Sequence, residues 1–387
     1  MEDFKIEHNE NGNSSRLAAD TSLFEIWDSS ILFPQPENME DPDIITQVSV
    51  TKAKKGEYHY LHEATIAHHA NKFYVGWSNH RTHENGNRDE LIRGCVSDDG
   101  LHWSEPETWV SAPALGLTSF NHPLLFEHSG TLYGFFVAWR GERPFTEIFT
   151  FDDEERKWIH HPDHSLPDFV PFCTPQLMEN GNWVLEGEFY WYHSAVAISN
   201  GEDMLNWKIV VIPESEKTKL LYPETAIVCQ KDRLLAVCRP RQIGSINADD
   251  ALTAPVSESF DFGENWGPIK MSNFPLGPSQ PFAGTLSTGQ NYLLTNSLEA
   301  NRTLLSIAVT EPGGKLFKKI YKVRHQAAPA IRLFGGYEDG IKGSFVGKPT
   351  EWAYPGAIEY DGKLYIIYSQ GKEDCSLSII PVEVLHP

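Results

Sequence analysis

Side chains that could act on a polar substrate stand at the ends of short apolar segments. Glu224 directly precedes one apolar run, and Arg239 directly follows the next one. A carboxylate at the start of a buried strand needs partners, and an arginine fork can bind a carboxylate through two parallel bonds. Tyr354 precedes Pro355, which predicts an extended backbone at the tyrosine. These residue types suit a polyhydroxylated ligand, with the arginines as partners for a carboxylate on it.

Similar positions hold histidines, further arginines and a glutamine, namely His62, His80, Arg81, His122, Arg140, Gln280 and Arg302. Histidine ionises near neutral pH, so His62, His80 and His122 are candidate acid/base groups. Histidines cluster early in the chain, but the adjacent His68 and His69 on one strand must point to opposite faces. Because no zinc-type His and Cys spacing accompanies them, we expect neither a metal nor a cofactor.

Strands must position these residues, because helix-period apolar stripes are scarce and short apolar runs are bounded by Gly, Asn, Asp and Pro. Six segments share one shape, which is a polar or Pro-containing triplet, an apolar strand, a polar turn and a second apolar strand. These predicted hairpins begin at His62, Phe120, Cys173, Tyr222, Gln280 and Tyr354. The candidate residues fall at the start of the first strand or the end of the second, except Arg302, which opens a third strand.

A second repeated signal follows most of the hairpins. It is an Asp, then a Gly and a Trp, at Asp98…Trp103 and Asp261…Trp266. Weaker copies stand at Asp153…Trp158, Asp203…Trp207 and Gly314…Phe317. The aromatic residues lie 55, 49, 59 and 51 positions apart. A period near 50 residues that holds three or four strands is typical of a propeller blade.

The repeats therefore predict an all-β chain that folds as a six-bladed β-propeller. Residues 1–21 form a flexible tail in this interpretation, and residues 22–387 form one domain closed by the N- and C-terminal strands. Residues 22–52 supply the outer strand of the closing blade. A seven-bladed ring is the alternative if residues 22–60 build more than one strand.

The Asp-containing units resemble the Asp-boxes of sialidase-type propellers, and the resemblance covers roughly residues 55–385. It implies that the starts of first strands and the ends of second strands share one rim, opposite the Asp-boxes. It also implies that Glu224 polarises the Tyr354 hydroxyl, which attacks or stabilises an oxocarbenium-like centre. Arg239 and Arg302 would then hold a substrate carboxylate.

The sequence departs from a standard sialidase at two places. The first inner strand opens with His62-Glu63-Ala64 where the family has an arginine, and only Glu84 and Asp89 stand near the position of the family's acid/base Asp. We therefore expect an exo-acting hydrolase that removes a terminal acidic sugar from a glycan or polysaccharide. The alternatives are a uronate-specific lyase or a rhamnosidase using His, Tyr and Arg, and a non-catalytic glycan-binding propeller.

Composition excludes several classes of partner. The 53 acidic and 32 basic residues give a net charge of −21, which opposes binding to nucleic acid or anionic membranes. No apolar run is long enough to span a bilayer. The N-terminus lacks the basic segment followed by an apolar segment that marks a secretory signal. We therefore expect a cytoplasmic protein if the chain is complete, and a periplasmic or secreted one if a signal was removed. Five widely spaced cysteines predict reduced thiols.

Overall fold

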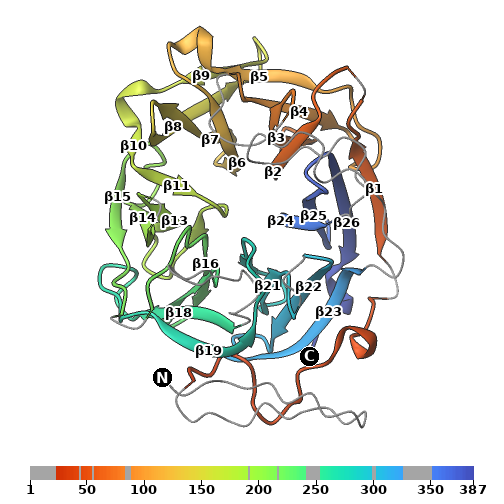
Figure 1. Cartoon of the computed structure of the whole chain (residues 1–387), viewed down its shortest axis with the longest axis vertical. Coiled ribbons are helices and arrows are strands. Elements are labelled where there is room, and N and C mark those ends of the chain that lie inside the picture. The colour runs from red at the N-terminus through yellow and green to blue at the C-terminus, as the bar shows by residue number, and fades with distance from the viewer. Residues whose placement is uncertain are drawn as a thin grey trace.

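The computed structural model describes residues 23–42, 45–54, 56–82, 89–190, 192–215, 218–240, 253–298, 302–325 and 351–387. Within these ranges the chain forms six antiparallel sheets around a common centre (Figure 1). The prediction of an all-β, six-bladed propeller is confirmed, and the described part of the chain contains no seventh sheet.

Each blade is built mainly from strands that follow one another in the chain, starting at the centre of the ring. The first blade contains β2 (Tyr60–His69), β3 (Lys72–His80), β4 (Leu91–Ser97) and β5 (Glu107–Ser111). The second contains β6 (Phe120–His128), β7 (Thr131–Arg140), β8 (Arg143–Asp152), β9 (Lys157–His160) and β10 (Leu166–Pro167). The third contains β11 (Phe169–Pro171), β12 (Gln176–Leu177), β13 (Trp183–Phe189), β14 (His193–Ser199) and β15 (Trp207–Val211).

The other three blades complete the ring. The fourth contains β16 (Thr225–Gln230), β17 (Arg233–Cys238), β18 (Thr253–Ser259) and β19 (Lys270–Pro275). The fifth contains β20 (Phe282–Thr285), β21 (Asn291–Thr295), β22 (Leu304–Thr310) and β23 (Phe317–His325). The sixth contains β24 (Trp352–Tyr360), β25 (Lys363–Gln370), β26 (Asp374–Pro381) and β1 (Thr46–Thr51). Short 3-10 turns lie at η1 (Pro36–Asn38), η2 (Ala112–Leu115), η3 (Pro162–His164) and η4 (Val382–Val384).

The N-terminal segment joins distant blades. Strand β1 pairs with β26, with Val48 opposite Leu377, and Figure 1 shows the two strands side by side. Before β1, the backbone N–H of Phe24 donates to the carbonyl of Met271 on β19. These bonds tie the start of the chain to blades four and six, so the ring is held closed without a covalent link at its ends.

The Asp-boxes stabilise turns, but their register differs from the prediction in two blades. In the first blade Asp99, not Asp98, accepts the N–H groups of Leu101 and His102, both at 2.8 Å. Asp98 is exposed and pairs with Lys72 instead. Adjacent aspartates made the sequence ambiguous here, because either one could have capped the turn.

The same shift occurs in the second blade, where Asp152 rather than Asp153 accepts the backbone N–H groups of the following turn. Asp203 and Asp261 act as predicted. The indole N–H of Trp266 donates to the carbonyl of Gly263 at 2.9 Å, which fixes the ring against its own turn.

Glycines make room for aromatic side chains inside the blades. The Trp109 ring lies over Gly76 and Gly94 of β3 and β4. A Cβ added at Gly94 would lie 2.1 Å from Trp109 Cζ2, so only glycine fits there. The five cysteines are free thiols, and the described chain contains no helix with the length and apolar character needed to cross a membrane.

Candidate active site

Several non-glycine residues at or near the start of inner strands have a strained backbone with a positive φ angle. His122, Tyr222 and Tyr354 each precede a proline and have φ values of 40°, 52° and 56°. The prediction of an extended Tyr354 was therefore wrong. Its strand shifts register between Ala353 and Gly356, and this bulge turns the residue into the left-handed region. A non-glycine residue in such a conformation costs about 1–3 kcal/mol, and this kind of strain gathers at functional sites.

Glu63 has the same kind of backbone, with φ 58°, at a register shift of β2. His122 lies at a matching shift of β6. Glu63, His122 and Tyr354 line one pocket at the centre of the ring. Three blades thus use an equivalent bulge to direct a polar side chain into a shared pocket.

Tyr354, Glu224 and Arg239 form one buried network. The Tyr354 hydroxyl donates to Glu224 Oε1, and Arg239 Nη1 donates to the same oxygen at 2.6 Å. Arg239 Nη1 also lies 3.2 Å from Tyr354 Oη. None of the three residues is more than 7% exposed. The phenol therefore has a carboxylate to receive its proton and a guanidinium to stabilise the negative charge left on its oxygen.

The charge on Arg239 survives burial because of its partners. Burial alone would lower the pKa of the guanidinium, but Glu224 and Tyr354 outweigh it and raise that pKa above its ordinary value. Arg302 joins the network from the next blade, with its guanidinium carbon 5.5 Å from the centre of the Tyr354 ring. Its Nη2 donates to the carbonyl of Pro278 at 3.0 Å, and Nη1 lies 3.8 Å from the Glu351 carboxylate. The four residues that the family resemblance singled out thus lie together.

Two histidines flank the Tyr354 ring. The His62 ring is fully buried, 4.1 Å from the Tyr354 ring between centroids, and its Nδ1 lies 2.7 Å from Ser369 Oγ. The His122 ring lies 6.5 Å from the Tyr354 ring. Both histidine rings are therefore close enough to the Tyr354 ring to contact the same bound sugar.

Glu63 holds His122 in place and was missed as a site residue by the sequence analysis. Its Oε1 lies 3.2 Å from His122 Nε2, and its Oε2 accepts the Ser78 hydroxyl at 2.7 Å and the His122 backbone N–H at 2.8 Å. Glu63 stands near the start of the first predicted hairpin as Glu224 does in the fourth, and that parallel could have identified it. The pair supplies an acid/base group close to Tyr354.

Gln280 also lines the pocket. Its side-chain amide donates to the carbonyl of Phe172 at 2.9 Å, which orients it against the third blade. The pocket wall next to it includes Phe172 and Thr174.

Three predicted residues make their described contacts outside the Tyr354 network. Arg140 donates to Glu147 on the neighbouring strand at 2.6 Å. Arg81 lies over the Tyr58 ring at 4.9 Å, and His80 Nδ1 accepts the N–H of Thr82 at 3.2 Å. Strand ends alternate in direction, so a position on the correct rim does not guarantee a side chain that faces the pocket. The alternative acid Glu84 lies outside the described residues.

Two further buried carboxyls, to which the sequence analysis gave no role, lie on β13, and one of them, Glu188, interacts with Glu224 and Arg239. Burial raises the pKa of Glu186 to about 8 and that of Glu188 to about 8. Glu224 raises the Glu188 value further, whereas Arg239 opposes the rise. Both carboxyls are therefore mainly neutral at pH 7. Among the described residues, no group of three or more His, Cys, Asp or Glu is arranged to hold a metal ion.

Comparison with known proteins identifies the family of this chain. The sequence profile of the BNR repeat-like domain matches residues 71–366. The chain belongs to the BNR repeat-like family. A search of curated proteins returns no match by sequence.

Solved structures share the fold of this BNR repeat-like protein at low identity. A protein of unknown function from Dyadobacter fermentans is 14% identical with a TM-score of 0.63, over 87% of this chain and 98% of that one. Trypanosoma rangeli sialidase is 12% identical with a TM-score of 0.58, over 88% of this chain and 60% of the sialidase. A covalent intermediate of the same sialidase with 2,3-difluorosialic acid is 11% identical with a TM-score of 0.60, over 90% and 60% of the two chains. The match thus spans about three fifths of the sialidase chain.

Proposed function

We propose that this protein is a glycoside hydrolase that removes a terminal acidic sugar, with Tyr354 as nucleophile and Glu224 as its base. The observation that carries the proposal is the hydrogen bond from the Tyr354 hydroxyl to Glu224, within reach of Arg239. A neutral phenol suits a substrate whose own carboxylate would repel an attacking carboxylate. Structures of sialidases with sialic acid and with a covalent sugar intermediate support this choice by fold similarity.

The first step forms a bond between Tyr354 Oη and the anomeric carbon, while the phenol proton passes to Glu224. The glycosidic bond breaks, and His122, held by Glu63, donates a proton to the leaving oxygen. In the second step His122 takes a proton from water, and the water oxygen bonds to the anomeric carbon as the bond between that carbon and Tyr354 Oη breaks. Glu224 then returns the proton to the released tyrosine oxygen. Two displacements at one carbon retain its configuration.

Arg239 and Arg302 are the partners for the substrate carboxylate. Arg302 lies over the face of the Tyr354 ring, and Arg239 lies at its hydroxyl. A carboxylate next to the anomeric carbon would therefore meet positive charge when that carbon reaches Tyr354 Oη.

Sugar release from a panel of sialate- and uronate-capped aryl glycosides and oligosaccharides tests the proposal. We expect release from at least one acidic sugar, and a loss of at least about 100-fold in kcat for Tyr354→Phe and for Glu224→Gln. Tyr360→Phe, a half-exposed tyrosine on the same strand, is the matched control and should retain full activity.

Two results would contradict the hydrolase. Binding without turnover, unchanged in Tyr354→Phe and Glu224→Gln, would make the protein a glycan-binding propeller. A product with the ultraviolet absorbance of an unsaturated uronate would make it a lyase, in which His122 removes a proton in place of nucleophilic attack.

A further inference from the structure

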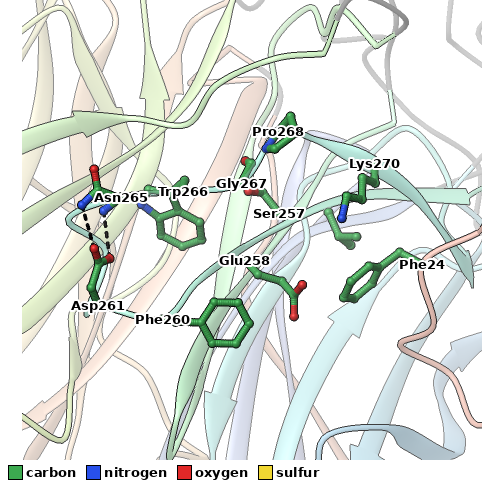
Figure 2. A pocket seen from close by; sticks show the side chains of 11 residues that line it. Phe24, Ser257, Glu258, Phe260, Asp261, Asn265, Trp266, Gly267, Pro268 and Lys270 are labelled. Atoms are coloured by element: carbon green, nitrogen blue, oxygen red, sulfur yellow. Dashed lines mark hydrogen bonds between the residues drawn. The ribbon is translucent and has the colours of Figure 1, made fainter.

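A cavity of about 400 Å³ lies beside the Asp-box of the fourth blade and shares no lining residue with the Tyr354 pocket. The N-terminal segment forms one wall, where Phe24 is held by its bond to Met271. The turn that contains Phe260 and Trp266 forms another (Figure 2). A volume of this size is typical of sites for small ligands or sugar rings.

Three aromatic side chains, those of Phe24, Phe260 and Trp266, contribute to the walls of this cavity. Phe260 is 69% exposed, the highest value among the large apolar side chains of the described residues, and Trp266 is fixed by its bond to Gly263. Figure 2 shows the Phe24 and Phe260 rings on either side of the Glu258 carboxylate. An exposed aromatic ring offers a flat apolar face to a ligand, and a ring that a hydrogen bond already holds, such as that of Trp266, loses little entropy when a ligand stacks on it.

Charged groups of both signs stand among the rings. Lys270 Nζ lies 5.7 Å from the centre of the Phe24 ring, and the Glu258 carboxylate faces the same space. Hydroxyl groups can accept from an ammonium and donate to a carboxylate. The combination of flat apolar rings with mixed donors and acceptors fits the two faces and the equatorial hydroxyls of a pyranose.

Phe260 also lines a second cavity of about 740 Å³, together with Lys231, Phe262 and Lys315. An ion pair between Arg233 and Glu258 joins the two spaces, because Arg233 lines the second cavity and Glu258 the first. Phe260 thus lines both cavities, and the exposed side chain that they share is called the Phe260 ridge below. A ligand that fills both must be longer than one ring.

We propose that this Phe260 ridge binds an oligosaccharide or polysaccharide chain, with one sugar stacked on Phe260 and its neighbours in the two cavities. Such a site would hold a polymeric glycan to the protein at the Asp-box of the fourth blade. The proposal does not depend on the role of Tyr354, because none of its residues belongs to the Tyr354 network.

Affinity electrophoresis tests the ridge in the full-length Tyr354→Phe protein, which keeps any hydrolysis from consuming the probe. Native gels would contain xylan, mannan, galactan or pectate. We expect at least one polymer to retard the protein, and Phe260→Ala to weaken that binding at least about tenfold through the loss of the stacked ring. Leu32→Ala, which removes another apolar side chain at 65% exposure, should leave retardation unchanged.

Three results would overturn the ridge as a sugar site. One is the absence of retardation by every polymer. Another is equal retardation of Phe260→Ala and its parent, with both shown to be folded by circular dichroism. The third is concentration-dependent self-association that Phe260→Ala abolishes in sedimentation, which would assign the ridge to contact between protein chains. Failure of the sugar-release assay would leave these outcomes unaffected, so the two proposals fail separately.

Discussion

The pairing of Glu224 with Arg239 makes a quantitative prediction about stability. The side chains of Glu224 and Arg239 are only 6% and 9% exposed, so removing either one leaves an opposite charge without its counterion in the interior. Loss of one partner from a buried pair costs about 3–5 kcal/mol. We expect Arg239→Met and Glu224→Met each to lower the free energy of unfolding by an amount in this range.

Glu188 should make the two losses unequal. When Glu224 is removed, Glu188 loses the negative charge that raises its pKa and can ionise as a substitute partner for Arg239. When Arg239 is removed, the hydrogen bond left to Glu224 Oε1 comes from the Tyr354 hydroxyl, which carries no positive charge, and Arg302 already binds the Pro278 carbonyl. Arg239→Met should therefore lie at the upper end of the range and Glu224→Met at the lower end.

The double variant completes the test. It contains neither charge, so it should lose only about 1–3 kcal/mol, mostly through the broken hydrogen bond to Tyr354 and imperfect packing. The sum of the two single losses should then exceed the loss in the double variant by at least about 3 kcal/mol. Urea unfolding of all four proteins at pH 7 measures these differences. Losses that add within about 0.5 kcal/mol would show that Glu224 and Arg239 do not form the buried pair.

Three further predictions concern other parts of the molecule. Burial raises the pKa of Glu188 to about 8 from an ordinary 4.5, so the folded protein holds this proton more tightly than the unfolded chain does. The resulting stabilisation is complete below about pH 4.5 and is lost as the pH rises to about 8. The urea midpoint should therefore fall across that range, and Glu188→Gln should make this fall less steep. A slope unchanged by the substitution would contradict this. Gly94→Ala should cost about 1–3 kcal/mol in the same assay, because its Cβ would overlap Trp109, and an unchanged midpoint would disprove the close packing. Asp99→Asn should lower the melting temperature more than Asp98→Asn, and the reverse order would restore the Asp-box register expected from the sequence.

Most of the architecture could be predicted from the sequence, because each blade repeats the same local pattern of apolar strand, polar turn and apolar strand. The period of that pattern is enough to predict a ring of blades, without knowledge of which distant residues are in contact. Backbone detail was harder to predict. The bulge at Tyr354 depends on the contacts of the whole inner strand, and a proline at the next position gives the opposite local preference.

The site was predicted in part for a similar reason. Glu224, Arg239, Arg302 and Tyr354 lie together because strand ends of different blades converge on one rim. Arg140 also ends a strand, but a buried carboxylate on its neighbour, Glu147, provides a partner away from the network. The direction of a side chain at a strand end depends on such pairings, and no local pattern encodes them.

Covalent trapping is the most direct test of Tyr354 as the nucleophile. A fluorinated analogue of the sugar that the panel identifies slows the second displacement, so the sugar remains bonded to the residue that attacked. Intact mass and peptide mapping should show one added glycosyl group on Tyr354, and none in Tyr354→Phe. An adduct on a carboxylate such as Glu63, or an unmodified Tyr354 in an enzyme that still turns over the natural substrate, would contradict the mechanism.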